Sequence, residues 1–344
     1  MRRLVTMAVI VALWTTALVA LGSVACAAAY KPEFKMSIVV NDQNPWGRAA
    51  IRFAGILKSR TEGRIQVKNY FAGELFAGEQ TKEFLLLQQG PADFAMGSTI
   101  NWSSQVKELN LFALPFLFPS YKALDAVEAG EPGRRLFKLI EENGVVPIAW
   151  GENGFRELTN SKRPVRRPQD LKGLRIRVVG LPIFMEIFRA LGADPITMSW
   201  AEAQRAFHQG TVDGQENPIA SLIIPYKLWL VHKHITFWHY AIDPVILGVN
   251  AKTWQGLSPQ DRDIVRKAGE EVMSLEKKEA REGLEGAMVV ANTLKNIYGM
   301  EVVQLSRREV KAFRDRTRPV YDRWAQQVGV ELVRAAEKIV EGAE

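Results

Sequence analysis

Cysteine and histidine are scarce in this sequence, with one cysteine and four histidines among 344 residues. The lone cysteine, Cys26, excludes an intrachain disulfide and every paired-cysteine metal site. Three catalytic signatures are also missing, namely the G-x-S-x-G nucleophile turn, the Walker phosphate loop and the H-E-x-x-H zinc motif. We therefore expect no enzyme activity, no metal and no cofactor, and a fold that depends on its hydrophobic core.

No Pro/Ser/Gly-rich linker or low-complexity tract divides the chain, so any domains must be joined by strands or helices. Hydrophobic residues make up 47% of the sequence, enough to bury the large core of a protein with two lobes. The formal charge of +7 comes from 45 basic and 38 acidic residues that are evenly mixed. Such mixing argues against a nucleic acid partner and favours a small anionic ligand.

The first 29 residues have the layout of a secretory signal peptide. Arg2 and Arg3 precede an apolar run, and small residues follow at positions 25–29. We predict cleavage before Tyr30 and an exported mature protein, whose 43 basic and 38 acidic residues leave a charge of +5. The alternatives are an uncleaved membrane anchor, since a spanning helix needs about 20 apolar residues, and a lipid anchor on Cys26.

Short β-rich runs alternate with helical patterns, which indicates an α/β fold. Ser199 and Ser258 each begin a capping pattern for the helix that follows. Residues 258–298 form an unusually long helical pattern, expected to brace both lobes either continuously or with a kink at Gly283 and Gly286. The β-rich runs are Phe34–Val40, Ile65–Tyr70, Val145–Trp150, Leu174–Val179 and Val245–Val249.

A weak internal repeat suggests two similar lobes. Arg64–Val67 is followed by a helical run and then by Gln89–Asp93, and Arg175–Val178 is followed by one that ends in Gln209–Asp213. Both read as strand, helix, Gln-Gly turn and strand. The motifs are short and permissive, so coincidence is the alternative.

A cationic strand within Leu174–Val179 carries Arg175 and Arg177 two positions apart. On a strand such side chains leave the same face, where a guanidinium fork can bind a carboxylate in a bidentate manner. Asn217 precedes Pro218, which favours an extended backbone at a strand end. We predict a carboxylate pocket formed by these segments; for one of the two arginines, a solvated position or a structural ion pair is the alternative.

These segments and several others resemble the DctP-type solute-binding proteins of TRAP (tripartite ATP-independent periplasmic) transporters. The similarity extends nearly end to end over the mature chain, and the order and spacing of the pieces make it specific. The pieces are Thr61–Ile65, Gly90 with Asp93, Leu114–Phe118, Gly154–Ser161, Asp170–Val178, Leu191–Ala193 and Asp213–Pro218.

The resemblance implies an α/β, type II-like periplasmic binding protein fold, with two lobes, hinge strands and a cleft between the lobes. Lobe I is expected to comprise residues 30–153 and 243–282, and lobe II residues 154–242 and 283–344. The family implies a receptor that closes on an organic acid in the periplasm. It would deliver the acid to small and large membrane permease subunits, which use an ion gradient rather than ATP.

The resemblance also implies a set of ligand-binding residues. The carboxylate-pairing arginine maps onto Arg177, a second basic contact onto Arg156, a site-lining amide onto Asn217 and an aromatic wall onto Trp200. Arg175 replaces the commoner Lys, and Trp200 stands where Phe is frequent, which alters the expected width of the pocket. Weaker candidates are Glu79, Asn44, Trp102 and Asp243, of which Glu79 would select a ligand hydroxyl or amine.

Other functions stay open at this point. A similar cleft would suit an exported hydrolase or isomerase, or the ligand-sensing module of a signalling system. His232 and His234 share a strand face, but two imidazoles alone do not make a zinc site, and we expect both at the surface. The identity of the acid is also undetermined, because dicarboxylates, 2-oxo acids, sugar acids and aromatic acids each satisfy one arginine.

Overall fold

The computed structural model describes residues 30–285 and 288–343. The chain divides into a short unit, residues 1–31, and a compact unit, residues 32–344, and the fold below is that of the second unit. The predicted signal peptide and Gly286 lie outside the described residues. Among the residues that are described, no helix combines the length and the apolar character needed to cross a bilayer.

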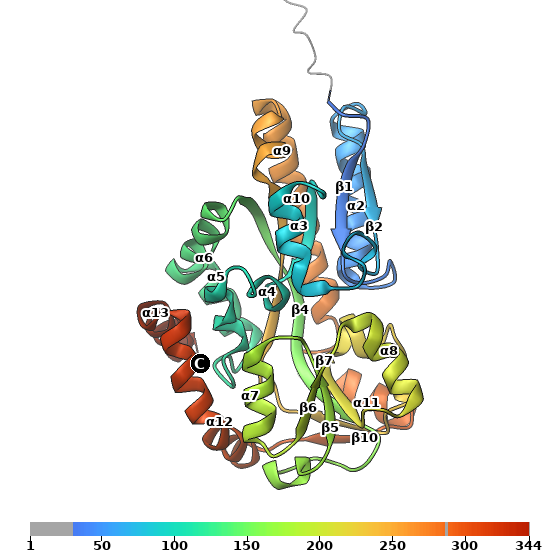
Figure 1. The fold of residues 1–344 in the computed structure, drawn as a ribbon, viewed down its shortest axis with the longest axis vertical. Coiled ribbons are helices and arrows are strands. Elements are labelled where there is room, and N and C mark those ends of the chain that lie inside the picture. Colours follow the sequence, from blue (N-terminus) through green and yellow to red (C-terminus); the bar gives the residue numbers. More distant parts are fainter. Residues whose placement is uncertain (1–29, 286–287, 344) are drawn as a thin grey trace, which may run out of the picture. The chain divides into compact units, whose positions relative to one another are not determined.

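Ten strands form one mixed sheet in the described part of the chain (Figure 1). Within it, β8 pairs with β4, and β10 pairs with β8. The order of the other strands is β2-β1-β3-β9-β4-β7-β5-β6. Each of the five β-rich runs predicted from the sequence overlaps a strand, which confirms the strand positions of the α/β prediction. The strands are β1 Phe34–Ile38, β2 Val67–Tyr70, β3 Phe94–Ser98, β4 Val145–Asn160, β5 Arg175–Val178, β6 Asp194–Thr197, β7 Gly214–Pro218, β8 His234–Phe237, β9 Ile242–Asn250 and β10 Glu301–Gln304.

Strand β4 links two groups of strands in the sheet. The strands β2, β1, β3 and β9 lie before it in the sheet order, and β7, β5 and β6 lie after it. Its first part, up to Phe155, pairs antiparallel with β9, and its last part, from Arg156 to Asn160, pairs antiparallel with β7. Two register irregularities interrupt the β4–β9 ladder, and the second lies between Glu152 and Gly154. Gly154 has a φ of +119°, which a residue with a Cβ rarely adopts. β4 therefore changes partners directly beside an irregular backbone segment.

Helices cover the sheet and follow the predicted α/β pattern. α10 packs against β4 and α2, α7 packs against β5 and β6, and α13 packs against α5 and α6. The α-helices are α2 Pro45–Arg60, α3 Glu83–Gln89, α4 Thr99–Trp102, α5 Tyr121–Ala129, α6 Glu131–Glu142, α7 Pro182–Ala190, α8 Trp200–Gln209, α9 Ala251–Gly256, α10 Pro259–Arg281, α11 Met288–Asn296, α12 Arg307–Val328 and α13 Val330–Ala343. Shorter helical turns are η1 Glu74–Phe76, η2 Gln80–Lys82, η3 Lys107–Ala113, η4 Pro168–Leu171, η5 Ile219–Ile223 (a π-helix) and η6 Leu228–Leu230.

The long helical pattern of residues 258–298 forms two helices rather than one. Ser258 caps α10 by accepting a hydrogen bond from the Asp261 amide, as its sequence pattern predicts. α10 ends at Arg281, and Gly283 follows with a φ of +71°. A left-handed glycine ends a helix readily, and of the two alternatives that the sequence left open, continuity or a kink, the structure shows an interruption at Gly283.

The internal repeat is structural in its second half. Gly90 and Gly210 both end helices in the left-handed conformation, and each precedes an aspartate three residues later. The Asp93 carboxylate accepts a hydrogen bond from the Lys35 amide at 2.7 Å, and Asp213 accepts one from the Arg175 amide at 2.9 Å. These contacts make β1 the counterpart of β5. The predicted equivalence of Arg64–Val67 with β5 is therefore wrong, because that segment leads into β2.

The hydrophobic core includes a cluster of aromatic side chains beside the point where β4 changes partners. Trp238 and Tyr240 precede β9, and their rings lie 4.7 Å apart. Phe188 of α7 and Phe313 of α12 pack edge-on against Trp238, with interplanar angles of 61° and 87°. The Trp238 indole N–H donates to the Arg156 carbonyl at 3.0 Å, which ties this cluster to β4.

Candidate functional site

A cavity of about 20 Å³ is lined by residues of the strands β3, β4, β5, β7 and β9 and of neighbouring helices and loops. Five of the eight predicted ligand-binding residues line it, and all five are buried. At this volume the cavity cannot admit an organic acid unless its walls move apart. The lining residues are Val39, Val40, Trp46, Gln80, Ser98, Asn101, Asn153, Arg156, Arg177, Val179, Trp200, Asn217, Leu222 and Asp243.

Arg177 of β5 is a buried cation in the cavity wall, only 1% exposed. Its Nε and Nη2 atoms donate to the Met198 carbonyl at 3.1 and 2.8 Å, and Nη1 makes no hydrogen bond within the described residues. No carboxylate of a described residue lies within ion-pair distance of the guanidinium. Burial lowers the pKa of Arg177 to about 10, so the side chain stays charged at neutral pH.

Trp200 forms an aromatic wall next to Arg177. The guanidinium carbon lies 5.7 Å from the centre of the Trp200 ring, within the range of a cation–π contact. Tyr226 packs edge-on against the same ring at 4.9 Å, which holds the indole in place. Trp200 is the first residue of α8, and the capping box of Ser199 and Glu202 fixes that helix start as predicted.

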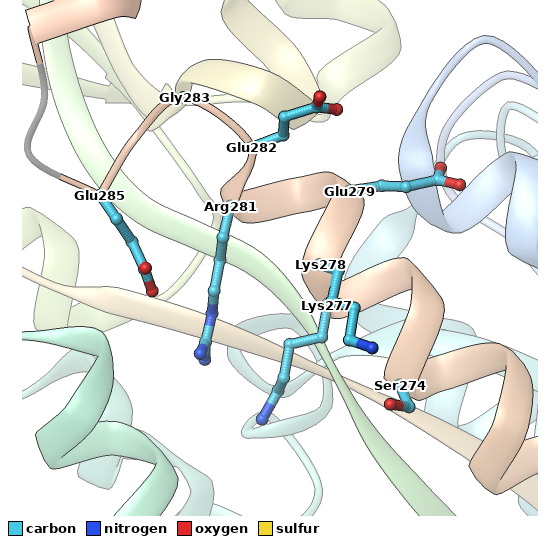
Figure 2. Close-up of a pocket in the computed structure, with 8 residues that line it drawn as sticks. All are labelled: Ser274, Lys277, Lys278, Glu279, Arg281, Glu282, Gly283 and Glu285. Atoms are coloured by element: carbon cyan, nitrogen blue, oxygen red, sulfur yellow. The ribbon is translucent and has the colours of Figure 1, made fainter.

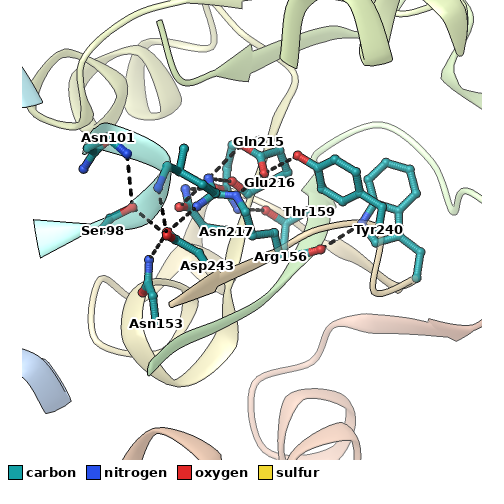
Figure 3. Close-up of polar contacts among 12 residues, drawn as sticks. Ser98, Asn101, Asn153, Arg156, Thr159, Gln215, Glu216, Asn217, Tyr240 and Asp243 are labelled. Carbon is teal, nitrogen blue, oxygen red and sulfur yellow. Dashed lines mark hydrogen bonds and ion pairs between the residues drawn. The ribbon is translucent and has the colours of Figure 1, made fainter. Parts of the chain in front are cut away.

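Arg156 of β4 is also buried, but two carboxylates neutralise it. It binds Glu216 through Nε and Nη2, and its Nη1 lies 3.2 Å from the Asp243 carboxylate (Figure 3). The Tyr240 hydroxyl donates to Glu216 at 2.6 Å. Asp243 also accepts from Ser98, and burial nevertheless raises its pKa. The two buried carboxylates are therefore committed to Arg156 rather than to Arg177.

Asn217 is held at the cavity by a chain of polar contacts. Its Oδ1 accepts from Arg156 at 3.0 Å, and its Nδ2 donates to Gln215. Gln215 in turn donates to the Thr159 hydroxyl at 2.7 Å, which contacts His232 Nδ1 at 2.9 Å. The prediction of a surface position is wrong for His232, because β4, β7 and α8 bury it, and burial lowers its pKa to about 4.

Gln80 and Asn101 supply a part of the cavity wall that contacts the start of α8. Gln80 Nε2 donates to Asn101 Oδ1 at 2.8 Å, and Gln80 Oε1 accepts from the Trp200 amide at 2.7 Å. Gln80 is thus bonded to a residue 120 positions further along the sequence.

Glu79, Trp102 and Asn44 do not line the cavity, in contrast to the sequence-based expectation. Glu79 is 57% exposed and pairs with Lys82, because the turn η2 directs the neighbouring Gln80 inward instead. Trp102 is fully buried in the core, and its indole donates to Glu83 at 3.2 Å. Asn44 caps α2, and its Nδ2 donates to the Ser221 carbonyl.

Arg175 forms the structural ion pair that the sequence left open for one of the two arginines. Its Nη2 lies 2.8 Å from Asp213, and its side chain is 42% exposed. This contact lowers the pKa of Asp213 to about 2. Arg175 therefore does not contribute its charge to the cavity.

The sequence reasoning missed several residues of the site. Asn153 precedes the Gly154–Ser161 segment by one position, and Trp46 follows Asn44 by two. Glu216 lies inside the segment Asp213–Pro218, in which only its neighbour Asn217 was predicted to line the site. All three residues lie within two positions of a predicted site residue or segment, and this proximity is the only signal that the sequence offers for them. No local pattern reveals which side chain of a turn or strand faces the cavity.

A larger hollow of about 640 Å³ lies at the C-terminal end of α10. Figure 2 shows the charged side chains that surround it. Lys277 pairs with Asp125 and Glu128, and Arg281 pairs with Asp125 and Glu152. Because these two cations already have carboxylate partners, this hollow is a poorer anion site than the cavity at Arg177. No group of three or more His, Cys, Asp or Glu in residues 30–285 and 288–343 has a metal-binding arrangement.

Known proteins share both the sequence and the fold of this chain. Residues 36–327 match the DctP family, described as bacterial extracellular solute-binding protein, family 7. The chain is 29% identical over 302 residues to the C4-dicarboxylate-binding periplasmic protein DctP of Rhodobacter capsulatus, covering 88% of this chain and 89% of that protein. It is 30% identical over 301 residues to the 2,3-diketo-L-gulonate-binding periplasmic protein YiaO of Escherichia coli strain K12, covering 85% and 87%.

A solved structure shares the fold at higher identity. It is a TRAP periplasmic solute binding protein from Ralstonia eutropha H16 with bound (S)-2-hydroxy-2-methyl-3-oxobutanoate. The TM-score is 0.89 at 48% identity, and the match covers 91% of this chain and 100% of that one. The predicted periplasmic binding protein fold is therefore confirmed. With a family match over most of its length, the chain belongs to family 7 of the bacterial extracellular solute-binding proteins, the DctP family.

Proposed function

We propose that this protein is a periplasmic receptor that captures a small organic acid with one carboxylate and delivers it to a TRAP permease in the membrane. The observation that carries the proposal is Arg177, a buried guanidinium in the cavity wall without a carboxylate partner among the described residues. An unpaired buried charge is costly, and a ligand carboxylate would relieve that cost through a charge-assisted hydrogen bond.

A single carboxylate fits the charge of the site better than two. Arg156 is the other cation at the cavity, and it already binds Glu216 and Asp243. A second ligand carboxylate would have to compete with these buried acids, which like-charge repulsion disfavours. The Ralstonia eutropha protein supports the same choice, because its bound ligand is an acid with one carboxylate, one hydroxyl and one oxo group.

Capture would occur by closure of two lobes, residues 30–153 with 243–282 and residues 154–242 with 283–344. Three hydrogen bonds between these segments support the proposal. They run from the Trp200 amide to Gln80, from the Asn41 amide to the Tyr226 hydroxyl at 3.2 Å, and from Asn44 to Ser221. We infer that the structure represents a closed arrangement, that the cavity walls separate enough to hold the acid when it binds, and that binding shifts an open–closed equilibrium towards the closed side.

Export and the membrane partner belong to the same proposal. Residues 1–29 would act as a signal peptide, and the small and large permease subunits would receive the ligand. Two relatives are periplasmic by name, which supports this location. No catalytic role is proposed, because the residues at the cavity form no nucleophile–base pair and the family comprises solute-binding proteins.

Thermal unfolding of the mature protein with a panel of organic acids tests this function. A ligand at 100 times its dissociation constant stabilises the folded protein by about 2.7 kcal/mol, which shifts the midpoint visibly. We expect a shift with a few monocarboxylates, no shift with them in Arg177→Ala, and recovery of the ligand chemically unchanged. A panel without any response, or an equal response in Arg177→Ala, would contradict the proposal; turnover of the acid would instead indicate an enzyme.

A further inference from the structure

Three buried polar atoms of residues that line the cavity have no hydrogen-bond partner among the described residues. They are the amide oxygen Oδ1 of Asn153 and the indole nitrogens Nε1 of Trp46 and Trp200. Asn153 and Trp46 are only 4% and 2% exposed, and the Trp200 ring already packs against Arg177 and Tyr226. A buried polar atom without a partner destabilises the fold by roughly 1–3 kcal/mol, so such atoms in a cavity wall point to a ligand that completes them.

The surroundings of Asn153 determine what its free atom can bind. Its Nδ2 donates to the Asp243 carboxylate at 2.7 Å, and a carboxylate only accepts, so the nitrogen must face Asp243 (Figure 3). The oxygen consequently faces away from Asp243 and remains an acceptor. The Asn153 carbonyl accepts from the Ser221 hydroxyl at 2.9 Å, which holds this part of β4 in place. A hydrogen-bond donor is needed to satisfy Asn153 Oδ1, and a ligand that fills the cavity would have to supply it.

A hydroxyl is a better donor for this position than an ammonium group. The cavity wall already contains Arg177 without a carboxylate partner, and it contains Arg156 nearby. Asp243, the acid that would attract an ammonium group, accepts hydrogen bonds from Ser98, Asn153 and Arg156. An ammonium group on the ligand would be repelled by these two arginines, and Asp243 is already engaged with other donors. A neutral hydroxyl avoids this repulsion.

Trp46 has the opposite requirement, because an indole N–H only donates. Trp46 lies in the first turn of α2, where Asn44 caps the helix by accepting from the Trp46 amide. The indole is thus positioned by the start of a helix rather than by a loop. An uncharged oxygen of the ligand would satisfy its N–H.

We propose that Asn153 and Trp46 determine ligand specificity, with Asn153 accepting from a ligand hydroxyl and Trp46 donating to a second, uncharged ligand oxygen. The inference rests on the proposed function, in which Arg177 binds the carboxylate. Together the three residues define the ligand class as small hydroxy acids that carry a further oxo or hydroxyl oxygen. Acids of the same size without the hydroxyl would leave Asn153 Oδ1 buried and unpaired.

Matched ligand pairs test each contact by isothermal titration calorimetry. 2-Hydroxy-3-methylbutanoate and 3-methylbutanoate differ only in the hydroxyl, and 2-hydroxy-2-methyl-3-oxobutanoate and 2-hydroxy-2-methylbutanoate differ only in the oxo group. We expect the parent protein to prefer the first member of each pair by roughly 10- to 100-fold, the range for one hydrogen bond to a buried group.

The variants separate specificity from folding. Asn153→Ala should reduce the hydroxyl preference to within about threefold of unity, and the ratio of the two dissociation constants measures this whether or not the overall affinity changes. Trp46→Phe keeps an aromatic ring and should reduce only the oxo preference. A parent without these preferences, or variants that weaken both members of a pair equally, would overturn the inference.

Failure of the proposed function gives a different result from failure of this inference. If the parent binds monocarboxylates through Arg177 but binds those without a hydroxyl as tightly as the hydroxy acids, the receptor function stands and the ligand class inferred here is wrong. If Arg177→Ala binds every acid as tightly as the parent, the proposed function itself fails.

Discussion

The cavity at Arg177 and the C-terminal end of α10 both contain buried charged groups, but the excess charge has opposite sign. At the cavity, Arg156 binds Glu216 and Asp243, and Arg177 has no carboxylate of a described residue within ion-pair distance. At α10, the buried acids Glu128, Glu152 and Glu276 each retain one oxygen without a hydrogen bond.

The two regions resolve the imbalance by different means. Beside the acids at α10, only Lys277 and Arg281 pair with Asp125, Glu128 or Glu152 in the described residues. Burial raises the pKa of Glu152 to about 7 and of Glu128 to about 8, so protons offset the excess of acid. Burial lowers the pKa of Arg177 only to about 10, so it keeps its charge and needs an anion. We expect a buried charge to act as a binding site where it lines a cavity and stays ionised at neutral pH, and the difference between the two regions is the basis of that expectation.

Arg177→Ala should break the cavity side of this comparison and have the largest effect. Removal of the unpaired guanidinium should weaken binding of the cognate acid by about 100-fold, in line with a charge-assisted hydrogen bond to a desolvated carboxylate. Arg177→Lys should restore little, because an ammonium group lacks the planar fork. Calorimetric dissociation constants measure both effects.

Arg175→Ala is the matched control for that experiment. Arg175 lies on the same strand but binds Asp213 at the surface, so its removal should change the dissociation constant by less than about threefold. An effect as large as that of Arg177→Ala would show that the strand, rather than one guanidinium, is required.

Glu276→Gln should break the acidic side of the comparison. Burial raises the pKa of Glu276 well above its usual range, so the folded protein holds a proton that the unfolded chain releases above about pH 4.5. The stability from this proton is complete below about pH 4.5 and is lost as pH rises above that value towards the raised pKa of the folded protein. The amide removes that loss, and we expect Glu276→Gln to be more stable than the parent by roughly 1–2 kcal/mol at pH 8.5.

Denaturant unfolding at pH 5.5 and pH 8.5 measures the effect of Glu276→Gln. Glu271→Gln on the exposed face of the same helix serves as the control and should leave the pH dependence unchanged, since Glu271 is 54% exposed. If Glu276→Gln is less stable than the parent at pH 8.5, the buried carboxylate is ionised and paired, and the account of α10 is wrong.

Asn44→Ser should have the smallest effect of these substitutions. It removes a hydrogen bond between the two proposed lobes without changing any charge at the cavity. Serine keeps the cap of α2 but loses the amide that donates to the Ser221 carbonyl. Loss of one closing hydrogen bond should weaken binding about three- to tenfold while the midpoint of unfolding without ligand changes little. An unchanged dissociation constant would mean that this contact does not favour the closed arrangement.

Much of the fold could be predicted from the sequence, because local patterns determine it. The β-rich runs, the caps at Ser199 and Ser258 and the interruption at Gly283 all depend on residues close together in the chain. The internal repeat matched the segment that leads into β2 with β5, and this match is wrong because β1 is the counterpart of β5. Pairing between distant strands leaves no local signal.

The site was predictable only in part, for the same physical reason. Arg177, Asn217 and Trp200 stand in segments with a distinctive pattern, and the structure places them together at one cavity. Glu79 and Gln80 are adjacent in the sequence, and only the three-dimensional course of η2 determines that Gln80 faces inward. The burial of His232 and the neutralisation of Arg156 likewise depend on residues far away in the chain.

The most direct test of the account is a crystal structure of the mature protein with its cognate acid. We expect a carboxylate oxygen of the ligand within hydrogen-bond distance of Arg177 Nη1, with Arg156 still bound to Glu216 and Asp243. A ligand whose carboxylate binds Arg156 instead, with Arg177 free of any anion, would contradict the central claim that the unpaired cation of the cavity is the binding residue.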